Sequence, residues 1–488
     1  MVYHLLLINA IIRFVESYIK ENINYSDLEK TVGMSYRYLR EEFRNYTKMP
    51  LKQYINTRKI ANIIFEMETT DKPLLTLATD YGFDAYDTFT RCFKREISIT
   101  PQQYKKENRR TVERKLIGMG TYAPVVTDMQ MPKLQFSDLQ EDSYILYGVP
   151  KVEFSNGKCT PFPACLESML SYIGQRKNHS YTWLMATSGV AFRFCWNAGK
   201  WDMSNSNIMN ITPQNPWEPY ERAYQAAGWK CNIIEKNNLT KEIFTTYIVN
   251  NINKGNPVIA LGVVGPPEAC IITGYNENGA GLFGWSYFQD NPEFSANAEI
   301  EKSGYFLCSK WWDNPETTAI ITLGERTSIP KLREILHHIY SILTMQSAGI
   351  YQAGQNAYQS WANDISNDIA FRGSSITPIL LNRFFCQADA ETMIGEGRYW
   401  GAQFFRQLGE EQTHIADLCF QAADLLTETA RYAQQMTAIR QGDKQTEEAI
   451  EMLCKPETRK EIVSLIKKAK ETEKRATTII SNLLDIIH

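Results

Sequence analysis

The sequence predicts a multidomain protein with an all-α first domain, a mixed α+β second domain and an α-helical third domain. Three observations support this prediction. A chain of 488 residues is too long for a single hydrophobic core. Residues 1–107 show short amphipathic helical patterns, whereas residues 140–326 alternate apolar runs with helical stretches and turn residues. Residues 327–488 are almost wholly helical in pattern, and residues 108–139 have poor periodicity and are expected to form a linker.

The composition is typical of a globular protein in a reducing compartment. Hydrophobic residues make up 43% of the chain and charged residues 22%, and no apolar run is long enough to span a bilayer. The opening segment carries charges at helical spacing, which predicts a folded helix rather than a signal peptide. The ten cysteines are scattered singly without a C-x-x-C pair, which argues against a zinc site and against a dense disulfide framework. We expect no metal and no cofactor. We therefore expect a cytoplasmic protein with no membrane partner.

Charge is divided unevenly along the chain. Residues 1–115 hold 20 Lys and Arg against 15 Asp and Glu, although the whole chain has a formal net charge of −3. A basic first part joined to an acidic remainder indicates a nucleic-acid partner for the first part only. Because the excess is small, the sequence motifs carry most of the argument.

Two stretches of the first domain share one layout, in which a short helix, a glycine turn and a second helix follow one another. They span residues 24–43, with the turn at Gly33, and residues 73–93, with the turn at Gly82. A connecting helix over residues 52–68 separates them. One such unit could be an ordinary helical hairpin, but two predict helix-turn-helix units, whose second helix can enter a major groove. Each second helix has an i, i+4 pair of apolar residues on its buried face: Leu39 with Phe43, and Phe89 with Phe93.

Five motifs extend across the first domain: "VGMS" with "YLREEF", "YINTRK", "LATDYGFDAYDTFTRCFKR" and "TPQQYK". Together they resemble the DNA-binding domain of AraC/XylS-family transcription regulators. The resemblance covers residues 5–107 and implies double-stranded promoter DNA as the partner. Lys48 and Ser98 depart from it, because the family usually has glycine after each recognition helix. Those two turns are expected to accept the cost of positive φ or to have a different shape.

The outward faces of the two second helices are the predicted DNA-contacting surface. Arginine in such a position can bind guanine through two hydrogen bonds, and threonine can contact a thymine methyl group. Arg44, Lys94 and Arg95 are better placed for phosphates. For each side chain, a solvated surface charge is an equally good interpretation. The outward residues are Tyr36, Arg37, Arg40, Glu41, Tyr86, Asp87, Thr90 and Arg91.

The second domain has a cysteine at the expected start of a helix. In "VEFSNGKCTPFPACLESMLSYIG", Cys159 follows a Gly-Lys turn and precedes an apolar helical pattern, a place where thiolate is favoured. Further along, "PEACIITGYNENG" predicts a buried strand that runs into a turn, with Glu268 at its start, and "GLFGWSYFQD" follows. A cysteine helix followed by strands with a leading base and an acid is the chain order of papain-like cysteine enzymes.

Residues 145–325 resemble the papain-like acyl-transfer domain at the N-terminus of butirosin biosynthesis protein H. The resemblance rests on the Gly-x-Cys helix start, the segment "YTWLMATSGVAFRFCW" and the Gly-Tyr turn at 274–275. It implies Cys159 as the nucleophile, position 268 as the base and Asp290 as the orienting acid.

Glu268 departs from this pattern, because a histidine is expected at that position. A carboxylate beside a thiol raises the thiol pKa by like-charge repulsion, whereas imidazole can accept the thiol proton near neutral pH. No histidine lies in residues 257–290, and His179 is expected in a surface loop. We therefore predict a catalytically inactive domain. A cysteine-dependent acyltransferase or peptidase that carries a DNA-binding domain is the alternative.

An inactive cleft still forms a pocket, and aromatic residues are frequent in the segments expected around it. Aromatic faces near a carboxylate favour an amine or a quaternary ammonium group, so we predict a small amine-bearing or aromatic effector centred on Glu268. For any single ring, core packing is the favoured interpretation, and for Glu268 the alternative is a structural salt bridge. The predicted ligand residues are Cys159, Phe162, Trp183, Phe194, Trp196, Glu268, Trp285, Tyr287 and Asp290.

The third domain contains an aromatic stripe beside two glycines. The segment "AETMIGEGRYWGAQFFRQL" begins as a helix, and Gly395 with Gly397 predicts a break at which Tyr399 and Trp400 would form a wall of the cleft. Core packing is the favoured interpretation of these rings, and the cleft wall is the alternative.

These features together predict a one-component, ligand-responsive transcription regulator. Besides the enzyme alternative, a DNA-bound scaffold that recruits protein through its acidic body is compatible with the sequence. The sequence leaves open whether RNA polymerase or a second copy of the chain, in a homodimer, is a partner.

Overall fold

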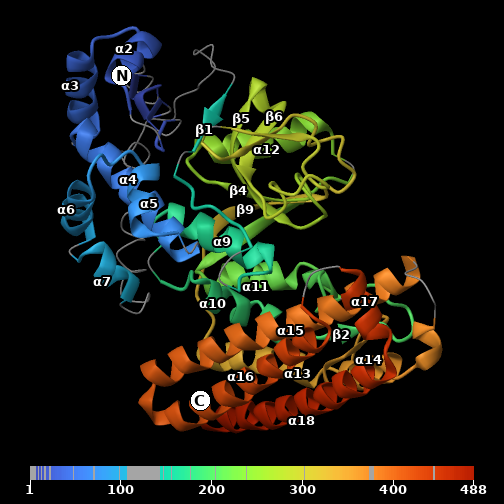
Figure 1. The fold of residues 1–488 in the computed structure, drawn as a ribbon. Helices are drawn as coiled ribbons and strands as arrows, with labels where there is room; N and C mark the ends of the chain where they lie inside the picture. The colour runs from blue at the N-terminus through green and yellow to red at the C-terminus, as the bar shows by residue number, and fades with distance from the viewer. Residues whose placement is uncertain are drawn as a thin grey trace. The chain divides into compact units, whose positions relative to one another are not determined.

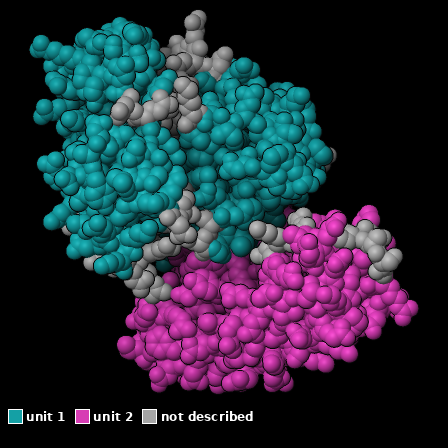
Figure 2. Space-filling view, in the orientation of Figure 1, with its two compact units in different colours: residues 1–179, 232–323 teal, residues 180–231, 324–488 magenta. Residues whose placement is uncertain are grey.

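The chain divides into two compact units. Unit 1 comprises residues 1–179 with 232–323, and unit 2 comprises residues 180–231 with 324–488 (Figure 2). The predicted linker and the turns at Lys48 and Ser98 lie outside the described residues. The computed structural model describes residues 7–106 and 143–487, with gaps at residues 9, 13, 16–17, 21–22, 48, 70–71, 98, 147, 155–156, 176, 204, 238, 302, 373–377 and 443–445.

The first part of unit 1 is helical, as expected (Figure 1). The paired apolar residues Leu39 with Phe43 and Phe89 with Phe93 are at most 1% exposed. Gly33 ends the first helix with φ at 74°, a conformation that glycine adopts without steric cost. The helices are α2 (Tyr25–Val32), α3 (Tyr36–Thr47), α4 (Leu51–Thr69), α5 (Leu74–Asp80), α6 (Tyr86–Ile97) and α7 (Pro101–Lys106).

The second part of unit 1 is built on a β-sheet that, within the described residues, has eight strands. Its main path runs β3-β9-β4-β5-β6-β8-β7, and β1 pairs with β5. Strands β4 and β5 read as continuous apolar runs because helices α9 (Pro161–Tyr172) and α12 (Lys241–Asn253) pack against them. The strands are β1 (Tyr144–Ile145), β3 (Trp229–Glu235), β4 (Val258–Leu261), β5 (Ala269–Asn276), β6 (Gly281–Trp285), β7 (Ala298–Ile300), β8 (Phe306–Cys308) and β9 (Ala319–Arg326).

Unit 2 is mainly helical, and α15, α16 and α18 pack along one another (Figure 1). A three-stranded sheet of β10 (Ser347–Ala348), β11 (Tyr351–Ala353) and β2 (Cys195–Trp196) completes it. The helices are α10 (Tyr181–Thr187), α11 (Glu218–Ala226), α13 (Leu332–Thr344), α14 (Gly354–Ile365), α15 (Pro378–Glu411), α16 (Ala416–Ile439), α17 (Glu447–Cys454) and α18 (Pro456–Ile486).

The division into units differs from the predicted one. Residues 180–231 were expected to belong to a domain spanning 140–326, but they pack with the C-terminal helices, and α10 lies against α15. The predicted break at Gly395 and Gly397 is wrong, because α15 continues through both. Gly397 instead allows close packing: a Cβ atom there would lie 2.6 Å from the carbonyl oxygen of Ala191.

Two buried ion pairs link the long helices of unit 2. Arg398 on α15 pairs with Glu473 on α18 through two of its guanidinium nitrogens, Nη2 lying 2.9 Å from Oε1 and Nε bonding Oε2. The second pair joins Arg440 Nε to Glu391 Oε2 at 2.7 Å. Both pairs are almost fully buried, so losing one partner would leave an uncompensated charge in the interior. None of the helices that the structure describes is long and apolar enough to cross a membrane.

Candidate nucleic-acid interface and predicted ligand cleft

Helix α3 presents a charged face opposite its buried pair. Arg37, Arg40 and Glu41 are exposed, as the periodicity predicts. Arg37 Nε lies 3.6 Å from Glu41 Oε1, and the two side chains are 85% and 56% exposed. An ion pair this exposed is weak, so the Arg37 guanidinium can leave it at little cost.

Tyr36, at the start of α3, is less outward than predicted. Its ring stacks on Tyr25 with the centroids 4.2 Å apart, and the side chain is half-buried. Burial, followed by the neighbouring Tyr25 hydroxyl, raises the pKa of Tyr36 to about 12. The phenol therefore stays neutral at physiological pH.

Helix α6 repeats this arrangement with different chemistry. Asp87 and Arg91 are exposed, and Arg91 Nε donates to the backbone oxygen of Asp87 at 3.3 Å. Tyr86 is half-buried against Phe89, with ring centroids 5.6 Å apart. Thr90 is also half-buried, and its hydroxyl oxygen is inaccessible to solvent. The residues expected to contact phosphates, Arg44, Lys94 and Arg95, are all exposed.

Comparison with known proteins identifies this part of the chain. A family model described as a helix-turn-helix domain matches residues 28–107. Regulatory protein SoxS of Salmonella typhimurium is 32% identical over 102 residues, which cover 95% of SoxS and 21% of this chain. The chain belongs to the AraC family. SoxS of Escherichia coli is 31% identical over the same length. Multiple antibiotic resistance protein MarA of Escherichia coli is 30% identical over 101 residues, which cover 80% of MarA.

The family membership settles the role of the first domain in general terms. It is the helix-turn-helix, DNA-binding domain of a transcription regulator. The matched residues, 28–107, include most of the first repeat, α4 and the whole of the second repeat.

In the second part of unit 1, Cys159 lies two residues before the start of α9, as expected. It is half-buried, and Phe162 is 1% exposed within the helix. The thiol beside Glu268 that sequence analysis missed is Cys165, whose Sγ lies 3.6 Å from the backbone oxygen of Ala269. Burial, then Cys270 and Glu268, raise the pKa of Cys165 well above its ordinary value, so this thiol stays protonated. The apolar helical pattern around Cys165 was the sequence feature that could have indicated a buried thiol.

Asp290 and Trp285, two of the predicted ligand residues, already make contacts within unit 1. Lys151 Nζ lies 3.8 Å from Asp290, 2.6 Å from Glu153 and 5.9 Å from the centroid of the Trp285 ring. Trp285 also donates its indole N–H to the backbone oxygen of Val149 at 2.9 Å. An internal lysine thus occupies the kind of environment that was predicted for an external cation.

Tyr287 belongs to a ring cluster at the surface of unit 1. It is 6% exposed and packs edge-on against Phe154, which is 56% exposed, with centroids 4.6 Å apart. Glu268, immediately before β5, is half-buried. Its backbone oxygen accepts the N–H of Gly262 at 3.0 Å.

Three predicted ligand residues lie in unit 2 and pack within it. The indole N–H of Trp183 donates to the backbone oxygen of Ala226, and its ring lies 5.9 Å from that of Phe404. Phe194 and Trp196 belong to a buried cluster around Trp361. The structure therefore does not group these three with Glu268 in one compact unit. Core packing, the interpretation favoured for any single ring, describes their contacts here, because residues 181–196 bury apolar side chains against the C-terminal helices.

His179 was expected in a surface loop, but it is 7% exposed. Burial lowers its pKa, although Glu167 opposes the shift, so the imidazole is neutral at physiological pH. Among the described residues, no group of three or more His, Cys, Asp or Glu side chains could hold a metal ion.

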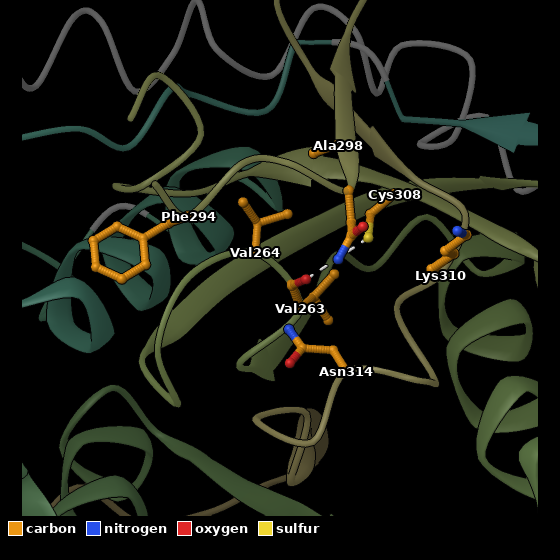
Figure 3. A pocket seen from close by; sticks show the side chains of 8 residues that line it. Val263, Val264, Phe294, Ala298, Cys308, Lys310 and Asn314 are labelled. Carbon is orange, nitrogen blue, oxygen red and sulfur yellow. Dashed lines mark hydrogen bonds between the residues drawn. The ribbon is translucent and has the colours of Figure 1, made fainter. Parts of the chain in front are cut away.

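A hollow in unit 1 lies beside β8 and the loop that follows β4 (Figure 3). Cys308 Sγ lies 3.7 Å from the backbone oxygen of Val263 at its wall. None of the predicted ligand residues lines it, so it is separate from the expected site. Its lining is Val263, Val264, Phe294, Asn297, Ala298, Cys308, Lys310 and Asn314.

Proposed function

We propose that the protein is a one-component cytoplasmic regulator that reads promoter DNA through α3 and α6 and responds to a small molecule through the rest of the chain. The proposed DNA reading rests on one observation, which is that α3 and α6 share the same pattern of buried and exposed side chains. Each buries an i, i+4 apolar pair and exposes an arginine, Arg40 or Arg91, outside that buried pair. Such helices fit the major groove as recognition helices.

Each exposed side chain has an assigned role in this proposal. Arg37, Arg40 and Arg91 donate to guanine, while Glu41 and Asp87 accept from the exocyclic amine of cytosine. Thr90 offers its methyl group, because its hydroxyl is buried. Tyr36 and Tyr86 support the helix starts and contact the DNA backbone.

The test is selection of duplexes from a randomised library by the full-length chain. Arg40→Ala and Arg91→Ala should each abolish preference at a different set of base positions, each at a cost of about 1–3 kcal/mol. Lys30→Ala, which removes an equal charge from α2, should leave the selected sequence unchanged. If both arginine variants select the native sequence, the base-contact assignment is wrong.

For the remainder of the chain we propose a catalytically inactive papain-like domain that binds an amine-bearing or aromatic effector. The proposed site comprises Glu268 together with the other predicted ligand residues that belong to unit 1. Its support is chemical: a half-buried carboxylate precedes β5 where a catalytic base would be needed, and the thiol beside it, Cys165, is held protonated. The other site residues are Cys159, Phe162, Trp285, Tyr287 and Asp290.

An effector amine in this site would compete with Lys151 for Asp290 and the Trp285 ring. Thermal unfolding of the full-length chain with a panel of amines and their uncharged isosteres tests this, since a ligand that binds the native state raises its stability. Glu268→Gln should weaken the amine about tenfold and the isostere much less. Equal loss for both compounds would make Glu268 a structural residue.

The alternative, a cysteine-dependent enzyme, is tested through Cys159. Cys159→Ser should leave the effector response intact, because the proposal includes no covalent step. Rapid, stoichiometric labelling of Cys159 by iodoacetamide or an acyl thioester at neutral pH would favour a cysteine acyltransferase.

RNA polymerase and a second copy of the chain complete the set of proposed partners.

A further inference from the structure

Glu29 holds the corner between α2 and α3 with two different groups. Its backbone oxygen accepts the N–H of Gly33, the residue that ends α2, at 2.8 Å. Its side-chain Oε1 accepts the N–H of Tyr36, the first residue of α3, at 2.6 Å. One residue therefore fixes both the end of the first helix and the start of the second.

The start of α3 depends on such outside acceptors. The first N–H groups of a helix have no partner within the helix, and an acidic group near them is favoured by the helix dipole. Ser35 supplies a second acceptor, its Oγ lying 3.4 Å from the N–H of Tyr38. The stacked rings of Tyr25 and Tyr36 join the same two helices. The carboxylate of Glu29 makes the shortest of these polar contacts.

The second helix-turn-helix unit uses different residues at this corner. Counting back four residues from the turn glycine reaches Glu29 in the first unit and Ala78 in the second. Alanine has no side-chain acceptor, and Ala78 is buried. The turn is also one residue longer, because Gly82 precedes the first residue of α6 by four positions rather than three. The carboxylate contact is therefore specific to the first unit.

We propose that Glu29 is a positioning residue for DNA reading by α3, an inference that rests on the proposed function. Tyr36 directly precedes Arg37, and Arg40 lies one turn further along the same helix. A two-point contact between an arginine and guanine tolerates little displacement, whereas phosphate contacts tolerate more. Fixing the first N–H of α3 fixes the direction in which the arginine side chains leave the helix.

The test uses the full-length chain and the duplexes that it selects from a randomised library. Base positions read by α3 are defined as those whose preference is lost in Arg40→Ala, and positions read by α6 as those lost in Arg91→Ala. Glu29→Ala should lower the preference at the α3 positions about tenfold, the effect of losing one charge-assisted hydrogen bond. Preference at the α6 positions and affinity for a scrambled duplex should stay within about twofold.

Two control variants separate the loss of the hydrogen-bond acceptor for Tyr36 from the loss of a negative charge. Glu29→Gln keeps a side-chain oxygen that can accept the Tyr36 N–H, so it should retain most of the preference. Asp27→Ala removes an equal charge from an exposed position on the same helix, where Asp27 pairs with Lys30 at 3.2 Å, and should change neither set of positions.

The outcomes distinguish this inference from the proposed function. If the native protein selects no sequence, the proposed DNA reading is refuted. If the native protein selects a sequence and Glu29→Ala selects it equally well, only the positioning role is refuted. An equal loss at the α3 and α6 positions would also refute it, because that pattern indicates general destabilisation of the domain.

Discussion

Replacing Glu66 with glutamine should lower the free energy of local unfolding of the DNA-binding domain at neutral pH. Glu66, on α4, is 8% exposed and lies between two lysines and a tyrosine. Its carboxylate is 2.7 Å from Lys20 Nζ and 2.9 Å from Lys72 Nζ, and the Tyr81 hydroxyl donates to it at 2.7 Å. Because α4 connects the two helix-turn-helix units, this cluster supports both.

The pKa of Glu66 gives the magnitude. Burial alone would raise the pKa, but the hydrogen bonds from Lys20, Tyr81 and Lys72 outweigh it and lower the pKa from 4.5 to about 2. At about 1.4 kcal/mol for each pKa unit, the ionised carboxylate stabilises the folded domain by about 3 kcal/mol. A carboxyl group with a lowered folded-state pKa contributes this stability above its unfolded pKa. The contribution is lost as the pH falls from 4.5 towards 2.

Hydrogen exchange of the full-length chain, corrected for the intrinsic pH dependence of exchange, measures the opening free energy of α4. Glu66→Gln should lower the opening free energy of α4 by about 2–3 kcal/mol at pH 7, and should remove the part of its acid-range pH dependence that Glu66 causes. Asp80→Asn is the matched control, because Asp80 contacts Lys72 at 3.0 Å but is 36% exposed. It should cost less than about 1 kcal/mol. Equal protection of α4 in the native and Glu66→Gln proteins at pH 7 would refute this reasoning.

Three further predictions concern α3 and unit 2. Glu41→Gln, which removes a negative charge beside Arg37, should raise affinity for a scrambled duplex about threefold to fivefold in a fluorescence titration at low salt; unchanged affinity would contradict it. Glu473→Gln should destabilise unit 2 by about 3–5 kcal/mol in thermal unfolding, because it leaves Arg398 buried without its charge partner; a shift no larger than that of Glu428→Gln, a carboxylate whose side chain is 36% exposed, would contradict it. Burial, then Arg222, lowers the pKa of His338 to about 4. Unit 2 should therefore lose stability as the pH falls from 6.5 to about 4, because only the unfolded chain takes up the proton in that range; His338→Leu should show no such loss in the same unfolding assay.

The helix-turn-helix domain could be predicted from sequence because its signals are local. An i, i+4 apolar pair and a turn glycine lie within one helix and its connection, so Leu39, Phe43, Phe89 and Phe93 were assigned to the core correctly. The same holds for the buried strand that begins after Glu268, whose apolar run and turn residues are contiguous.

Long-range contacts decided the rest. The segment containing Trp183, Phe194 and Trp196 has an apolar pattern that fits any core, and only the folded chain shows that it packs with the C-terminal helices. Lys151 reaches Asp290 across 139 positions of sequence, and periodicity carries no information about such a pair. Sequence patterns identify which face of an element is buried, but the partner of that face depends on the packing of the whole unit.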